Sequence, residues 1–250
     1  MNLRRAAAAL GLALAAGLSV SACTTHAGAA AQVGDTRIAT SELRGLVTRG
    51  AEAARGAAPG QQVDEAVLAR QQLRLLVTDE LVGRLARSLG VSVTGQQVDG
   101  FRAAFAVLQY GGEQGLRQAA ARGGIAASDL PMVLRSRALE EAVGDKVAGD
   151  LTVPAGQVRQ AYEQVRARFG PVPLTLEQAT PELRRLLLRE QRSARVQPLL
   201  QEQARKAGVS VNPRFGRWDP DQLAVVEADG SLSTRAPGPP ATSPPPSIAP

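Results

Sequence analysis

The chain of 250 residues has one cysteine and one histidine, and both lie near its amino terminus, at Cys23 and His26. Thiol and imidazole groups are common nucleophiles, general bases and zinc ligands. A Ser–His or Cys–His catalytic arrangement needs a histidine that a rigid scaffold holds in place. Residues 24–30 are small and polar, which is typical of a tether. We therefore interpret His26 as a linker residue and expect no catalytic or metal-binding role for it.

The residues before Cys23 explain its position. Two arginines precede an uncharged apolar run over residues 6–18, and small residues follow that run. This order is the layout of a secretory signal peptide, and the run is shorter than the roughly 20 residues that span a bilayer. Residues 20–23, Val-Ser-Ala-Cys, resemble a bacterial lipobox. The resemblance implies cleavage before Cys23 and a diacylglycerol on its sulfur, after export by the Sec route.

Lipidation at Cys23 would hold the protein on the extracytoplasmic face of the cell membrane. It would also remove the free thiol that a single cysteine leaves in an exported protein. The alternative is an ordinary secretory signal cleaved near Ala30, with an incidental cysteine. We divide the chain into four parts: a lipoprotein signal peptide (1–22), a lipidated tether (23–30), a folded domain (31–219) and a disordered Pro-rich tail (220–250).

Composition and motifs argue against several function classes. The formal charge is +6, but basic and acidic residues alternate along the predicted helices, so nucleic acid is not an expected partner. Neither a P-loop nor a dinucleotide-binding glycine motif occurs. The carboxylate pairs Asp79–Glu80 and Glu140–Glu141 occupy adjacent helical positions, which point about 100° apart and do not converge on one atom. We expect solvated helix charge there, and we expect no enzyme activity, cofactor or metal site.

The hydrophobic pattern predicts a mainly α fold. Aromatic residues are only 3% of the chain, so Leu, Val and Ala must form the core. Leu73, Val77, Leu81 and Leu85 recur at four-residue intervals, which predicts one amphipathic helix over 64–89. Further helices are expected from Thr40 or Ser41 through Val47 and over 94–110, 113–122, 128–148, 154–168 and 181–207. Residues 50–61 are expected to be a loop or a fraying helix end, Thr180-Pro181 a helix start, and Pro198 a kink or break. Short strands are expected near 31–38 and 209–218.

Two stretches resemble the N-terminal chaperone domain of the SurA/PrsA family. Residues 75–98 are similar to that family's long helix, Leu-Gly link and following capped helix, and residues 33–43 are similar to its opening strand and first helix. Residues 153–162 resemble the segment that precedes the parvulin isomerase domain. The stretch from Tyr162 to Thr180 is too short for a parvulin domain and has no histidine. The resemblance, over residues 31–218, therefore implies a SurA-N-like helical domain without the isomerase. We expect the 209–218 segment to return to the N-terminal strand.

Together with the lipobox, the resemblance implies a membrane-anchored extracytoplasmic chaperone-like protein that weakly holds unfolded or extended exported polypeptides. Large apolar side chains are the candidate peptide contacts, although core packing is the alternative role for each: Phe101, Phe105, Tyr110, Met132 and Trp218. The alternative function is a helical lipoprotein scaffold that binds one specific envelope partner or the cell wall. In that interpretation the Pro-rich tail is a spacer.

Overall fold

The computed structural model describes residues 28–228 and confirms the mainly helical fold. The lipobox with Cys23, His26 and most of the Pro-rich tail lie outside these residues. The strands of the described part are β1 (Ala29–Val33), β2 (Thr36–Ala39), β3 (Val209–Val211), β4 (Arg217–Asp219) and β5 (Ala224–Val226). Its helices are α1 (Thr40–Ala57), α2 (Glu65–Ser88), α3 (Gly95–Tyr110), α4 (Glu113–Arg122), α5 (Leu130–Val147), α6 (Ala155–Phe169), α7 (Leu176–Leu187) and α8 (Arg189–Ala207).

A small sheet joins the two ends of the folded part. Strand β1 lies between β2 and β3 and pairs antiparallel with both, with Ala31 opposite Val211. Gly34 allows the tight turn between β1 and β2, because its φ of 62° is in the left-handed region that favours glycine. The predicted return of the 209–218 segment to the N-terminal strand is therefore confirmed. Strands β4 and β5 form a second, two-stranded sheet.

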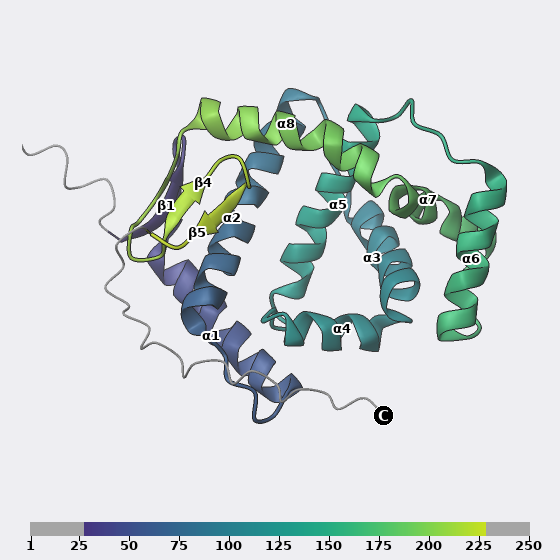
Figure 1. Ribbon diagram of the computed structural model, residues 1–250, viewed down its shortest axis with the longest axis horizontal. Coiled ribbons are helices and arrows are strands. Elements are labelled where there is room, and N and C mark those ends of the chain that lie inside the picture. The colour runs from purple at the N-terminus through teal and green to yellow at the C-terminus, as the bar shows by residue number, and fades with distance from the viewer. Residues whose placement is uncertain (1–27, 229–250) are drawn as a thin grey trace, which may run out of the picture.

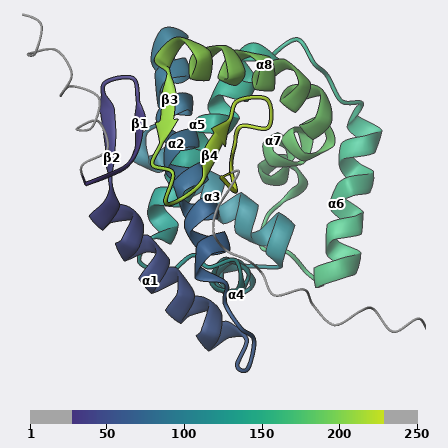
Figure 2. The same ribbon diagram turned by 60° about the vertical axis from the view of Figure 1, so that its left-hand side comes forward.

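Helix α2 is the centre of the main hydrophobic core. Its predicted stripe is buried, with Leu73, Val77 and Leu81 at most 1% exposed. The helix contacts α1, α5 and α8 as well as β1 and β5. Two smaller clusters continue the core, one around Phe101 and Leu134 and one around Leu183. Figures 1 and 2 show the strands at one end of the molecule and α6 at the other, with α8 crossing between them.

Side-chain caps explain where several helices begin. Asp64 accepts hydrogen bonds from the backbone amides of Ala66 and Val67, as its position before the apolar stripe predicts. Thr94 and Gln97 form a capping box at the start of α3. These two helix starts are confirmed.

The expected helix start at Thr180-Pro181 is wrong. Thr175 and Gln178 form a capping box, so α7 begins at Leu176 and contains Pro181. The helix does not break at Pro198, which lies inside α8; the division between α7 and α8 is at Leu188 instead. Pro198 lies on the exposed face of α8, where water can satisfy the carbonyl that has lost its donor.

Three other boundaries differ from the predictions. The folded domain begins before residue 31, because Ala29 and Ala30, expected in the tether, belong to β1 and are fully buried. Helix α1 continues through residues expected to form a loop or fraying end, because Gly50 and Ala51 are buried where α1 packs on α4. At the other end, β5 lies beyond residue 219, the predicted end of the domain. Leu223 and Val225 are buried against α2 and α8, which explains why this short apolar segment is ordered. Within residues 28–228, no helix is both long and apolar enough to cross a membrane.

Candidate functional site

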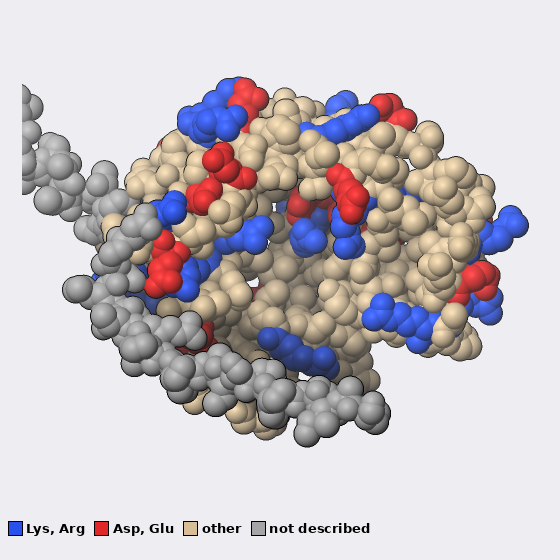
Figure 3. Space-filling model, in the orientation of Figure 1, with Lys and Arg blue, Asp and Glu red and all other residues tan. Residues whose placement is uncertain are grey.

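A cleft of about 360 Å³ runs along one face of α8. Helix α8 contributes residues that recur at steps of three and four along one face: Arg189, Arg192, Ser193, Val196, Gln197 and Leu200. At 1.5 Å per residue this face is about 16 Å long. Helices α2, α3, α5 and α7 and the turn before β5 supply the other walls. Figure 3 shows the surface hollowed below α8, with charged side chains gathered under it.

Apolar side chains line part of the cleft. They come from α3, α7, α8 and the turn before β5: Phe105, Leu186, Val196, Leu200 and Leu223. Val196, Leu200 and Leu223 also belong to the main core, so the packing around α2 fixes their positions. The cleft therefore has an apolar surface that the core holds in place.

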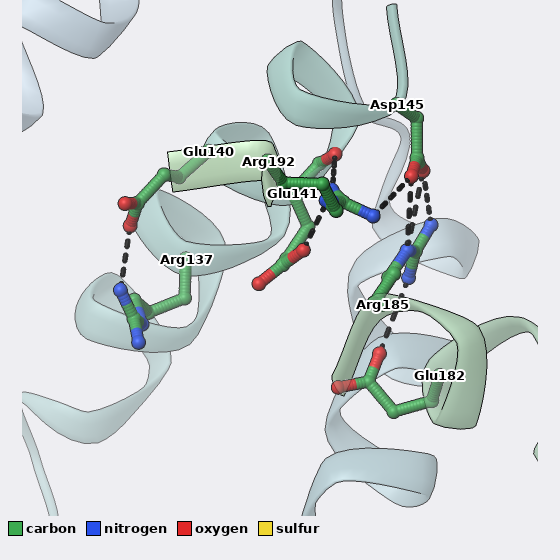
Figure 4. Close-up of polar contacts among 7 residues, drawn as sticks. All are labelled: Arg137, Glu140, Glu141, Asp145, Glu182, Arg185 and Arg192. Carbon is green, nitrogen blue, oxygen red and sulfur yellow. Dashed lines mark hydrogen bonds and ion pairs between the residues drawn. The ribbon is translucent and has the colours of Figure 1, made fainter. Parts of the chain in front are cut away.

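A chain of ion pairs forms one wall (Figure 4). Arg192 on α8 donates to Glu141 at 2.8 Å and to Asp145 at 2.7 Å, both on α5. Asp145 also accepts from Arg185 on α7 at 2.6 Å, and Arg185 lies 3.3 Å from Glu182. We call these five residues the ion-pair chain. Because its members alternate in sign and come from three helices, it fixes α7 and α8 against α5.

The space for Arg192 depends on a glycine. A Cβ at Gly144 would lie 2.5 Å from Nη2 of Arg192, closer than two such atoms can approach. The same nitrogen donates to the backbone carbonyl of Glu141 at 2.8 Å. Gly144 therefore leaves room on α5 for the guanidinium group, and the local backbone satisfies one of its donors.

Burial perturbs two carboxyl groups of the ion-pair chain. Desolvation raises the pKa of Glu182, and the nearby charge of Glu141 raises it further, while Arg185 and Arg192 oppose the shift. Desolvation likewise raises the pKa of Glu141, against the opposing effect of Arg192. Both carboxylates are bonded to arginines, an arrangement that favours structural ion pairing over proton transfer to a ligand.

Two arginines of the cleft have no acidic partner within residues 28–228. Nε of Arg74 on α2 donates to the carbonyl of Leu223 at 3.1 Å, and the guanidinium group of Arg189 at the start of α8 has no hydrogen bond or ion pair to the described residues. The hydroxyl of Thr78, which also lines the cleft, is buried without a hydrogen-bond partner there. No group of three His, Cys, Asp or Glu residues in the described part is placed to hold a metal ion.

No known protein-family model matches the chain, and no curated protein sequence matches it significantly. The cleft must be interpreted from its own residues.

The structure does not bring the five candidate peptide contacts onto one surface. Phe101 is 7% exposed and stacks on Phe105, with 5.2 Å between ring centroids, and Tyr110 meets the edge of Phe105. Met132 and Trp218 pack, partly buried, against the main core. Of the five, only Phe105 lines the cleft.

The ion-pair chain is the main feature that sequence reasoning missed. Glu140 and Glu141 do point to different partners, Arg137 and Arg192, as adjacent helical positions predict (Figure 4). The expectation of solvated charge is nevertheless wrong for Glu141, because its partner Arg192 is 8% exposed and the pair lies in the wall of the cleft. The four-residue spacing of Glu141 and Asp145 was a signal of one shared acidic face, but nothing local identified its arginine partners.

Proposed function

We propose that the protein is a lipid-anchored, extracytoplasmic chaperone-like protein that weakly holds exported polypeptides and has no isomerase activity. The observation that carries this proposal is the open cleft along α8, which combines apolar side chains with charged and amide groups. An extended polypeptide presents the same mixture, because its side chains alternate in direction and its backbone carries donors and acceptors.

The dimensions of the cleft support weak binding. A face about 16 Å long accommodates about five residues of extended chain at roughly 3.3 Å each. A contact of this size buries far less surface than a stable protein–protein interface, and each ordered side chain opposes binding. Short occupancy is what a holding function requires, since the client must leave again in order to fold.

The position of the proposed anchor fits this role. Strand β1 begins at Ala29, six residues after Cys23. Six residues span at most about 21 Å when fully extended. A lipid on Cys23 would therefore keep the folded domain and its cleft close to the membrane across which exported chains emerge.

Light scattering by a heat-aggregating client protein tests the proposal. We expect the protein to suppress the scattering, and a cleft-filling variant, Ser193→Trp, to lose most of the effect. Gln191→Trp is the matched control, because residue 191 is exposed on the same helix and does not line the cleft. Failure of the unmodified protein to suppress scattering would contradict the proposal. If the protein instead binds one partner stoichiometrically and has no effect on aggregation, the result would favour the alternative function of a helical scaffold.

A further inference from the structure

The charges that line the cleft do not balance. The lining has five arginines and three glutamates. Each glutamate is paired with a different lining arginine: Glu140 with Arg137, Glu141 with Arg192 and Glu182 with Arg185. Arg74 and Arg189 are left without a carboxylate in the described part of the chain, so the cleft presents two uncompensated positive charges.

These two charges lie at opposite ends of the cleft. Arg189 is the first residue of α8, and Leu200 is the last residue of that helix in the lining. The turn before β5 meets α8 near Leu200, because Nε2 of Gln201 donates to the carbonyl of Asp221 at 2.8 Å. Arg74 is bonded to this same turn through the carbonyl of Leu223. About 16 Å of helix face therefore separates the region of Arg74 from the start of α8.

Apolar side chains occupy the space between them. Val196 and Leu200 on α8 and Leu223 opposite them line this middle part of the cleft. An apolar surround lowers the effective dielectric constant and strengthens the attraction of a guanidinium for a carboxylate. The glutamates of the lining are already paired, so they offer little attraction to a basic ligand.

We propose that the cleft selects extended polypeptide segments that carry two carboxylates four residues apart, with apolar side chains between them. Side chains alternate in direction along an extended chain, so carboxylates four residues apart point to the same side, and the segment between them covers about 13 Å of the roughly 16 Å cleft. Arg74 and Arg189 would each pair with one carboxylate, and Val196, Leu200 and Leu223 would contact the central apolar residues. This inference rests on the proposed holding function and specifies the chemistry of the client.

Fluorescence anisotropy with a labelled peptide, Ser-Glu-Val-Leu-Val-Glu-Ser, tests this selection. The same peptide with Gln or Lys in place of both Glu residues provides the comparison. We expect the Glu peptide to bind about tenfold more tightly than the Gln peptide and the Lys peptide to bind most weakly, because exposed charge pairs each contribute up to about fivefold in affinity. Raising the salt concentration should reduce the difference.

Substitutions of Arg74 and Arg189 test whether these two arginines cause the tighter binding of the Glu peptide. Arg74→Gln and Arg189→Gln should each weaken binding of the Glu peptide about threefold to fivefold, and the double variant about tenfold, without changing binding of the Gln peptide. Arg205→Gln, on the same helix as Arg189 but outside the cleft, is the matched control and should bind normally. Equal weakening by Arg205→Gln would overturn the assignment to the cleft.

The outcomes separate this inference from the function on which it rests. If the protein suppresses client aggregation but binds all three peptides equally, the holding function stands and the acidic selection is overturned. If it neither suppresses aggregation nor binds any of the peptides, both proposals are overturned.

Discussion

Arg192 on α8 and Glu141 on α5 form an ion pair with 2.8 Å between Nη2 and Oε2, although 51 residues separate them in the chain. The arginine is 8% exposed and also bonds Asp145, so the contact fixes α8 across α5 in the wall of the cleft. Pairs of this kind cost desolvation energy, and their main contribution is to favour one arrangement of the helices. Removing one partner tests this role.

Arg192→Ala should lower the free energy of unfolding by about 2–4 kcal/mol, because it leaves the partly buried carboxylate of Glu141 without its cation and removes one of the two arginines bonded to Asp145. Urea titration followed by the fluorescence of Trp218, the only tryptophan, measures the change. Arg195→Ala is the control on the same helix, since its pair with Asp150 is on the surface and should matter little. Equal losses for the two variants would contradict the structural role of the ion-pair chain.

The pH dependence of the free energy of unfolding should include a contribution from Glu182. Its pKa is raised, mainly by desolvation, so the folded state binds this proton more tightly than the unfolded state. Its contribution to stability is therefore fully present below the unfolded pKa of about 4.5 and is lost as the pH rises through the folded pKa. Relative to Glu182→Gln, the unmodified protein should gain stability when the pH falls from 7 to 4.5, as urea titrations at each pH would show.

Glu113 provides a comparison of opposite sign. Its hydrogen bond with Arg102 lowers the pKa of this carboxyl group, so its contribution is present above the unfolded pKa and is lost as the pH falls through the folded pKa. Relative to Glu113→Gln, the unmodified protein should lose stability on acidification below about pH 4.5. If acidification changed the stability of the unmodified protein in the same direction relative to both Gln variants, either the burial of Glu182 or the hydrogen bond between Glu113 and Arg102 would be contradicted.

Gly50→Ala tests the packing of α1 on the turn after α4. A Cβ at residue 50 would lie 2.2 Å from the carbonyl oxygen of Gly124, so the two segments must separate. We expect a loss of about 1–3 kcal/mol in the free energy of unfolding. Gly56→Ala in the same helix meets nothing within 4 Å and should be neutral or stabilising by up to about 1 kcal/mol. Differential scanning calorimetry should show a lower Tm for Gly50→Ala and an unchanged or higher Tm for Gly56→Ala.

Cys23→Ala tests the proposed anchor. Without the sulfur that would accept the lipid, the protein should move from the membrane fraction to the soluble extracytoplasmic fraction, as immunoblots of fractionated cells would show. His26→Ala, three residues away, is the matched control and should remain with the membrane. Retention of the Cys23→Ala protein in the membrane fraction would contradict the lipid anchor.

Local signals in the sequence predicted much of the fold. The helix starts expected at residues 64 and 94 and the four-residue repeat of leucine and valine along α2 depend on neighbouring residues, and all of them are confirmed. The helix start expected at Thr180 is wrong because Thr175 and Gln178 form a capping box five residues earlier. The Thr-Pro pair and the capping box are both local patterns, and the capping box satisfies more of the unpaired backbone amides at a helix start.

The features that local signals could not predict depend on contacts between segments that are distant in the sequence. Strand β5 is ordered because Leu223 and Val225 pack on helices that are far away in sequence, and no local pattern indicates those partners. The cleft has the same origin, since Arg74, Arg137 and Arg189 come from three helices. Sequence spacing within one helix could not show which arginines would be paired and which would be left free.

We propose that the cleft along α8 holds exported polypeptides. Site-specific photo-crosslinking in living cells tests this proposal most directly, with a photoreactive phenylalanine analogue at residue 197 in the cleft or at residue 191 on the same helix outside it. We expect many different exported polypeptides to crosslink to position 197 and few to position 191. A single stoichiometric partner at position 197, or the same set of polypeptides at both positions, would contradict it.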